Sequence, residues 1–256
     1  AFVRAHPDGT FFHLAGWRTV LERRLGHRAH YLYATEDGRI PGVLPLGHLR
    51  SRLFAHSLVS TPFCVYGGPL AEDDAARNAL VQAACELAER LGVGHLELRS
   101  RVRCCPDWHS GDLYVRFRKA ITADADDNLQ AIPRKQRAMV RKGIAHGLTS
   151  EIDADDRRLY PIFAESVRNL GTPVFPRRLF RTLLDVFADA SEILTVVDQG
   201  RPVASVLSFY FPDEVLPYYG GGLPAARECA GNDFMYWEVM RRAAERGARW
   251  FDFGRS

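Results

Sequence analysis

The sequence has few cysteines and lacks any long hydrophobic run. Its five cysteines are an odd number in 256 residues, which is poor material for a disulfide framework and typical of a reducing compartment. We therefore expect a cytoplasmic protein. No apolar run of about 18 residues occurs, so no membrane-spanning segment is predicted. The N-terminus lacks both a Met and a signal-peptide pattern, and we expect a short leader before Ala1.

Motifs for several common chemistries are also absent. His27, His30 and the stretch CCPDWH at 104–109 fit no common zinc spacing, so no metal site is predicted. There is no nucleophile elbow, no P-loop and no dinucleotide-binding glycine pattern. A net charge of +3 does not by itself indicate nucleic acid, and DNA is not an expected partner. The composition, 46% hydrophobic and 25% charged, is that of a globular protein with a core.

The chain contains one pattern of elements twice. In residues 31–46, and again in residues 193–211, two β-rich runs flank a turn that ends in Gly-Arg, which predicts a hairpin in each half. A further β-like run, a Gly-rich loop, a helix and a last strand follow each hairpin. The helices are predicted at about residues 73–91 and 233–246, with Asn232 as the N-cap of the second.

This order predicts a mixed α/β chain of the α+β class, formed by duplication. We expect one domain in residues 1–120 and a second in residues 121–256, because RFRKAITADADD changes there from β-like to acidic sequence. The last stretch, WFDFGRS, is a predicted strand at the very end of the chain. Such a strand would ordinarily need a neighbour to cover its edge, so we expect further residues after Ser256.

The segment IPRKQRAMVRKGIAHGL, residues 132–148, predicts an amphipathic helix with an acidic lead-in at 124–127 that favours its N-terminal end. No acid occurs between residues 127 and 151, although surface helices usually mix charges because like charges one turn apart repel. The cationic face is either a solvated surface or, as we favour, a site for a diphosphate, a tRNA or a membrane headgroup. Its residues are Arg134, Lys135, Arg137, Arg141 and Lys142.

Three loops carry further candidate side chains. Residues 220–233, GGGLPAARECAGND, can direct backbone N–H groups at an anion, or form a plain turn. Residues 61–70, TPFCVYGGPL, either line a pocket or only turn the chain, and residues 168–176 are a predicted loop between two helices that could cover a substrate. The binding candidates are Tyr66, Thr172, Phe175, Tyr218 and Tyr236, and the proton-relay candidates are Tyr219 and Asp233.

The tandem order, the basic helix, and the stretches TPFCVYGGP, LGTPVFP, GNDFMYWEVMRRA and FDFGRS together resemble the Fem-type transferases. They look most like the FemAB-like proteins associated with exosortase/PEP-CTERM exopolysaccharide loci. The resemblance covers nearly the whole chain and implies two tandem GNAT-like (N-acetyltransferase fold) domains, each a mixed sheet flanked by helices. It also makes Arg255 of FDFGRS a candidate substrate-binding residue.

The resemblance implies transfer of an acyl or aminoacyl group to an amine of a cell-envelope or exopolysaccharide-related acceptor, either a small molecule or a lipid-linked saccharide. The donor would be an acyl-CoA or an aminoacyl-tRNA, with Asp233 or Tyr219 as proton acceptor and the basic helix on the phosphates. Two departures leave the donor open. No coiled-coil arm is present, and residues 227–232 do not fit the Q/R-x-x-G-x-G/A loop of coenzyme A users.

Two alternatives remain at the level of sequence. One is an ordinary acyl-CoA-dependent N-acetyltransferase. The other is a non-catalytic module that binds RNA or another polyanion through the basic helix at 134–142. Peripheral association with a membrane is compatible with either.

Overall fold

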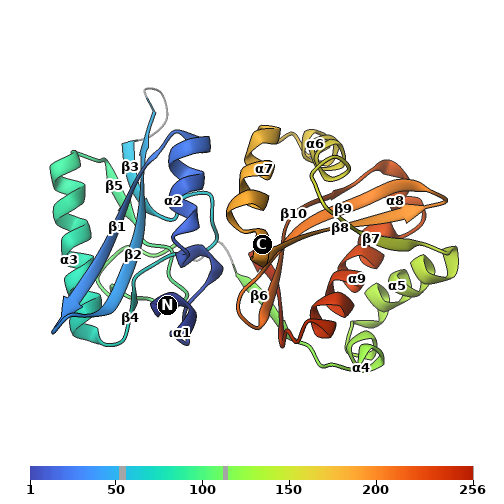
Figure 1. Ribbon diagram of the computed structural model, residues 1–256, viewed down its shortest axis with the longest axis horizontal. Coiled ribbons are helices and arrows are strands. Elements are labelled where there is room, and N and C mark those ends of the chain that lie inside the picture. Colours follow the sequence, from blue (N-terminus) through green and yellow to red (C-terminus); the bar gives the residue numbers. More distant parts are fainter. Residues whose placement is uncertain (52–55, 112–114, 256) are drawn as a thin grey trace. The chain divides into compact units, whose positions relative to one another are not determined.

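The computed structural model describes residues 1–51, 56–111 and 115–255, without the side chain of Arg255. The chain forms two compact units, Ala1–Leu113 and Tyr114–Ser256, called the first and the second unit below (Figure 1). Each unit has its own sheet and its own helices.

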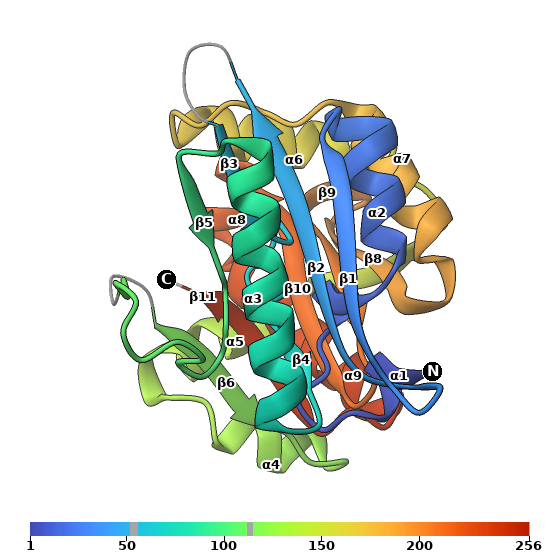
Figure 2. The same cartoon turned by 90° about the vertical axis from the view of Figure 1, so that its left-hand side faces the viewer.

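The first unit is a mixed sheet with the long helix α3 on one face. Its strand order is β1-β2-β3-β5, with β4 paired to β2, and only the β3/β5 pair is parallel. Apolar side chains of α3 pack on Leu44 and Leu46 of β2, and α3 lies in front of the sheet in Figure 2. Figure 1 shows α2 on the other side of this sheet. The elements are α1 (Phe2–Ala5), η1 (Phe11–His13), α2 (Gly16–Val20), η2 (Leu21–Leu25), β1 (Arg28–Glu36), β2 (Arg39–Arg50), β3 (His56–Ser60), β4 (Leu70–Ala71), α3 (Asp74–Leu91) and β5 (His95–Glu97).

The second unit is a mixed sheet in the order β6-β11-β10-β9-β8-β7, in which only the β10/β11 pair is parallel. Its strands are β6 (Arg116–Ala120), β7 (Thr149–Asp153), β8 (Ser191–Asp198), β9 (Arg201–Tyr210), β10 (Glu214–Gly222) and β11 (Trp250–Arg255). Its helices are α4 (Ala125–Gln130), α5 (Arg134–His146), α6 (Leu159–Asn169), α7 (Arg177–Val186), η3 (Ala188–Ala190), α8 (Pro224–Glu228) and α9 (Gly231–Glu245).

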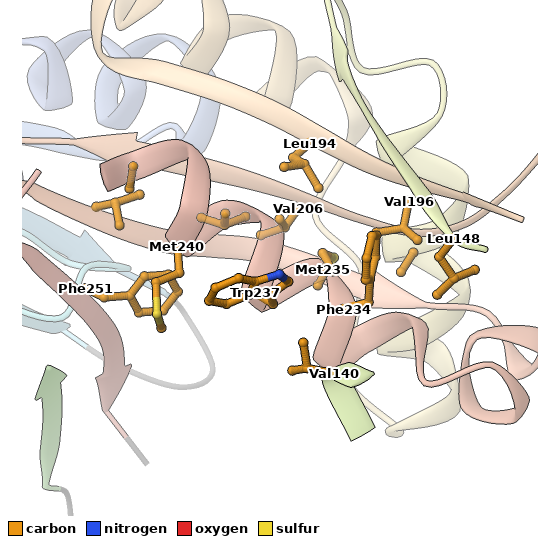
Figure 3. Close-up of a cluster of buried hydrophobic side chains, with 14 of the residues drawn as sticks. Val140, Leu148, Leu194, Val196, Val206, Phe234, Met235, Trp237, Met240 and Phe251 are labelled. Carbon is orange, nitrogen blue, oxygen red and sulfur yellow. The ribbon is translucent and has the colours of Figure 1, made fainter. Parts of the chain in front are cut away.

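Helices cover both faces of this second sheet. A Cβ atom at Gly221 would meet Ser166 of α6, whereas one at the next residue, Gly222, would meet Asn232 of α9. Because successive residues of a strand point to opposite faces, α6 and α9 lie on opposite sides of the sheet. The main core forms under α9, where Trp237, Met240 and Phe251 pack together, and α5 adds Val140 to it (Figure 3).

The structure confirms both predicted hairpins. Glu36 pairs with Arg39 and Asp198 with Arg201, so each turn has two central residues. All four central residues have positive φ, 47° and 79° in the first turn and 46° and 80° in the second. Two-residue turns with this backbone are the type I′ turns whose twist matches that of paired strands.

Two of the expected helix starts are wrong. Asn232 lies inside α9, and the N-cap is Ala230, in a left-handed conformation with φ of 61°. The acids at 124–127 belong to a separate helix, α4, where the Asp124 side chain accepts a hydrogen bond from the Asp127 backbone N–H. The basic helix α5 begins after Pro133 without an acidic first turn. Proline there interrupts the helix because it cannot donate a backbone hydrogen bond.

The structure also places β6 with the second sheet. This strand pairs antiparallel with β11, from Arg116↔Arg255 to Ala120↔Trp250. The expected domain boundary after residue 120 would separate β6 from the sheet to which it is hydrogen-bonded. The sequence predicted that one edge of β11 would need a further neighbour. In the structure β6, which comes much earlier in the chain, covers an edge of β11.

Candidate active site

The parallel strands β10 and β11 diverge soon after they meet. They pair only at Glu214↔Trp250 and Val215↔Phe251, although β10 continues to Gly222. A register shift between Pro217 and Tyr219 places a bulge in β10 just beyond that point. Bulges bend a strand and redirect its side chains, and an unpaired strand edge presents N–H and C=O groups to a ligand. The divergence is thus a place where backbone groups can hold a substrate.

The start of α9 lies close to the far end of β10. The side-chain oxygen of Asn232 would be only 2.2 Å from a Cβ atom at Gly222, so the glycine allows the strand and the helix to approach. Helix N-termini carry free N–H groups and favour negative charge. Asp233 follows in the first turn, and partial burial raises the pKa of its carboxyl group. A raised pKa suits a carboxylate to proton acceptance.

Tyr219 lies in an aromatic cluster on the other face of the sheet. Its ring is 5.8 Å from that of Phe163, 6.1 Å from that of Phe175, 5.3 Å from that of Phe180 and 4.8 Å from that of Tyr218, all in edge-on contacts. Phe163 and Phe180 belong to α6 and α7. The structure therefore brings together three candidates, Phe175, Tyr218 and Tyr219, but keeps them on the side opposite α9 and Asp233.

The remaining candidates of this unit are dispersed. Tyr236, one turn along α9 from Asp233, stacks on Phe253 of β11 at 6.3 Å, and burial raises the pKa of its hydroxyl. Thr172 is exposed in the loop between α6 and α7. Arg255 ends β11, and its side chain lies outside the described part of the structure.

The basic helix α5 presents its charges to solvent. It packs against α9 through Gly143, whose added Cβ would lie 2.9 Å from that of Phe234. Arg137 donates hydrogen bonds to the backbone and side chain of Gln130. The other four cations of this helix are exposed, and no ion pair joins them to an acid within residues 1–51, 56–111 and 115–255. Four cationic side chains therefore lie exposed on one face of α5.

A buried charge cluster at the base of the divergence was missed at the sequence level. Arg116 lies 2.6 Å from Glu214 and 3.0 Å from Asp252, and Arg118 lies 2.8 Å from the other oxygen of Glu214. Glu214 is 5% exposed and Asp252 is fully buried. Burial, and then the hydrogen bond with Asp252, raise the pKa of Glu214. The only sequence signal was the acid between two phenylalanines in FDFGRS.

Tyr66 lies in the first unit, where the loop at 61–70 does line a cavity, of about 230 Å³. Cys64 is buried but is not part of that lining. Within the described residues, no group of three or more His, Cys, Asp or Glu side chains could hold a metal ion. Among the described helices, none is both long enough and apolar enough to cross a bilayer.

The chain is similar to known proteins in both its sequence and its fold. Residues 130–256 match the family model described as an acetyltransferase (GNAT) domain. The solved structure of FemX is 16% identical, with a TM-score of 0.73 over 99% of this chain and 85% of its own. A tandem GNAT protein from the clavulanic acid biosynthesis pathway is 13% identical, with a TM-score of 0.54 over 97% of this chain and 81% of its own. The chain has a tandem GNAT-like fold.

A further solved structure shares the fold. It is the C-terminal domain of a putative lysylphosphatidylglycerol synthetase from Agrobacterium fabrum, 15% identical, with a TM-score of 0.56 over 88% of this chain and 70% of its own. No curated protein sequence matches significantly.

The tandem GNAT-like fold explains the repeated element order. In each unit a hairpin is followed by a further strand, and the last strand of the unit pairs in parallel with that further strand. A long helix, α3 or α9, directly precedes each last strand. The β3/β5 and β10/β11 pairs are thus equivalent positions in the two units.

Proposed function

We propose that the protein is an acyltransferase that forms an amide between an acyl or aminoacyl group and an amine. The divergence of β10 and β11, with the bulge in β10, carries this proposal, because it lies within the residues that match the GNAT domain. Backbone N–H groups beyond the bulge would stabilise the oxyanion that forms when the amine attacks the acyl carbon. The new C–N bond replaces the C–S bond to coenzyme A or the C–O bond to tRNA.

Asp233 is the proton acceptor in this proposal. The attacking amine loses a proton as the C–N bond forms, and a carboxylate of raised pKa near the end of β10 can take it. Tyr219 is the second candidate, but its hydroxyl belongs to a ring enclosed by Phe163, Phe175 and Phe180. These rings, with Tyr218, lie on the face of the sheet opposite Asp233, so they take no part in the proposed proton transfer.

The acceptor is proposed to be an amine of a cell-envelope or exopolysaccharide-related compound. Its support is the sequence resemblance to the FemAB-like proteins of exosortase/PEP-CTERM loci. One solved structure with the same fold is named for a lysylphosphatidylglycerol synthetase, a name that combines an amino acid with a membrane lipid. As part of the proposal, we extend this class of aminoacyl transfer to the present chain.

The first experiment tests the donor and Asp233 together. Labelled acetyl-CoA or aminoacyl-tRNA is incubated with the protein and a panel of aminosugars and diamines, and transfer is measured. General-base catalysis contributes about 10²- to 10⁴-fold. Asp233→Asn should therefore lower kcat at least tenfold without weakening donor binding, whereas Asp185→Asn, an exposed aspartate on α7, should not. Unchanged turnover in Asp233→Asn would remove the assignment.

The exposed cations of α5 favour a second candidate, in which the donor or partner is an RNA such as aminoacyl-tRNA. Replacing Arg134, Lys135, Arg141 and Lys142 by Gln should weaken tRNA binding at least tenfold and flatten its salt dependence, because each phosphate contact releases counterions. The control replaces four exposed arginines elsewhere in the second unit, Arg168, Arg178, Arg201 and Arg227. Equal affinity of both variants would exclude α5 as the binding face. Tight binding without transfer would favour the non-catalytic module.

A further inference from the structure

The first unit contains a cavity of about 230 Å³ at the end of its own parallel strand pair. β3 and β5 pair from Ser57↔His95 to Val59↔Glu97, and the chain segments that leave both strands, 66–71 and 99–104, line the cavity. The N-terminal segment closes another side with residues 6–13. In open sheets, ligands bind outside the carboxyl ends of parallel strands, so this is a favourable position for a site.

The walls of the cavity are held by buried hydrogen bonds. The His13 ring accepts a hydrogen bond from the Thr10 backbone at 3.2 Å, and its Nε2 lies 2.9 Å from the Gly68 carbonyl oxygen. The N–H groups of Gly67 and Gly68 both donate to the Arg99 carbonyl oxygen, at 3.2 and 3.1 Å. Ser60 accepts from the Arg99 N–H at 2.7 Å. Such a network orders the cavity before a ligand arrives.

Two glycines allow this arrangement. Gly67 has φ of 143°, which side chains rarely tolerate, and a Cβ atom there would lie 2.2 Å from the Thr61 hydroxyl oxygen. A Cβ atom at Gly68 would lie 2.1 Å from the hydroxyl oxygen of Ser100, which lines the cavity. Glycine at these positions therefore brings the two strand-end segments together and leaves room between them.

Among the described residues, the lining of the cavity carries more positive than negative side chains. Four arginines contribute to it, Arg77, Arg99, Arg101 and Arg103, against one carboxylate, Asp8. The acids that pair with Arg77 and Arg99 are Asp74 and Glu97, and neither lines the cavity. Arg101 lies over the ring of Tyr66 at 5.1 Å, which orients it. Burial lowers the pKa of His13 to about 4, so this side chain is neutral and adds no charge at pH 7.

We propose that this cavity binds the phosphate group of a small phosphorylated compound such as a sugar phosphate. Guanidinium groups suit phosphate because they donate planar, paired hydrogen bonds. Several guanidinium groups also match the two charges of a phosphate dianion better than they match the single charge of a carboxylate ligand. Binding pockets for drug-sized ligands occupy about 300–1,000 Å³, so the smaller cavity suits a headgroup or a monosaccharide phosphate. This site lies in the first unit and is independent of the transfer chemistry proposed for the second.

Calorimetric titration of the full chain tests the proposal, with glucose 1-phosphate, inorganic phosphate and glucose as probes. Glucose 1-phosphate should bind saturably, inorganic phosphate more weakly and glucose not at all. Arg101→Gln and Arg103→Gln should each raise the Kd for glucose 1-phosphate at least tenfold. Arg90→Gln removes the same charge from an exposed position on α3 outside the lining and should leave the Kd unchanged.

A second readout locates the bound ligand. Cys104 lines the cavity, with its sulfur 3.3 Å from the Ser100 hydroxyl oxygen, whereas Cys85 of α3 does not line it. Glucose 1-phosphate should slow alkylation of Cys104 by N-ethylmaleimide at least fivefold and leave Cys85 unaffected. Binding that survives in the Arg101 and Arg103 variants, equal binding of glucose, or the absence of saturable binding by the folded chain would each overturn the proposal.

Discussion

Burial gives the first unit a histidine with unusual acid–base behaviour. His13 is 7% exposed, and both its ring nitrogens have partners on the cavity wall, Thr10 and Gly68. Burial is the largest cause that lowers its pKa, to about 4 from 6.5, while the hydrogen bond with Gly68 acts in the opposite direction. In the unfolded chain the same ring would take up a proton near pH 6.5. The folded protein therefore excludes a proton that the unfolded chain binds.

This difference predicts a pH dependence of stability. Above pH 6.5 His13 is neutral in both states, and as the pH falls toward 4 the unfolded state gains a proton and stability is lost. The shift corresponds to about 3 kcal/mol. The free energy of unfolding, measured in urea at pH 7.5 and 4.0, should fall between the two pH values by about 3 kcal/mol less in His13→Gln than in the parent chain. His109→Gln, at an exposed position, should behave like the parent, and a parent-like response of His13→Gln would contradict the prediction.

Single residues were predictable from the sequence only where a local pattern marks them. Tyr66 stands beside two adjacent glycines, which is a local signal, and its ring does line a cavity. Glu214 had no such signal, and Asp252 had only its place between two phenylalanines, because the partners Arg116 and Arg118 lie on β6, far earlier in the chain. A pairing across so many residues depends on the order of the strands, which single-sequence patterns do not specify.

At the scale of elements, the two hairpins and the extent of α3 were predicted well. The hairpin turns have the type I′ backbone, and α3, predicted at about residues 73–91, extends from Asp74 to Leu91, with Asp73 as its N-cap and the left-handed Gly92 at its end. The predicted N-cap of α9 was wrong, because Asn232 packs against Gly222 instead of capping the helix. The close approach of β10 and α9 is a tertiary contact, and it overrides the local preference of asparagine.

The contact between α5 and α9 gives a prediction about Gly143. Alanine normally favours a helix over glycine by about 1 kcal/mol. A Cβ atom at position 143 would, however, lie 2.9 Å from Cβ of Phe234 and 3.3 Å from a methyl group of Leu148. Such overpacking costs about 1–3 kcal/mol. Gly143→Ala should therefore lower the free energy of unfolding, as measured in urea.

A matched change in the same helix separates the two effects. Ala145 is exposed, so Ala145→Gly measures the helix preference alone and should cost about 1 kcal/mol. If Gly143→Ala proved as stable as the parent or more stable, α5 would not be held against α9 at this distance.

At the scale of the whole molecule, the repeated order of elements was visible in the sequence, while the composition of each sheet was not. The order of elements along the chain predicts β6 as part of the first domain, residues 1–120. In the structure β6 pairs with β11 and supplies both arginines of the buried cluster. The duplication is therefore regular in its hairpin–strand–helix–strand core and irregular at the edge strand.

This arrangement predicts how the second unit behaves by itself. A fragment of residues 114–256 contains all six strands of the second sheet and should unfold cooperatively in urea. A fragment of residues 121–256, cut at the boundary expected from the sequence, lacks β6. It leaves the buried carboxylates of Glu214 and Asp252 without Arg116 and Arg118. Removing the partners of buried charges costs about 3–5 kcal/mol each, so this shorter fragment should be far less stable or unfolded. Equal stability of the two fragments, compared by circular dichroism during urea unfolding, would show that β6 does not complete the second sheet.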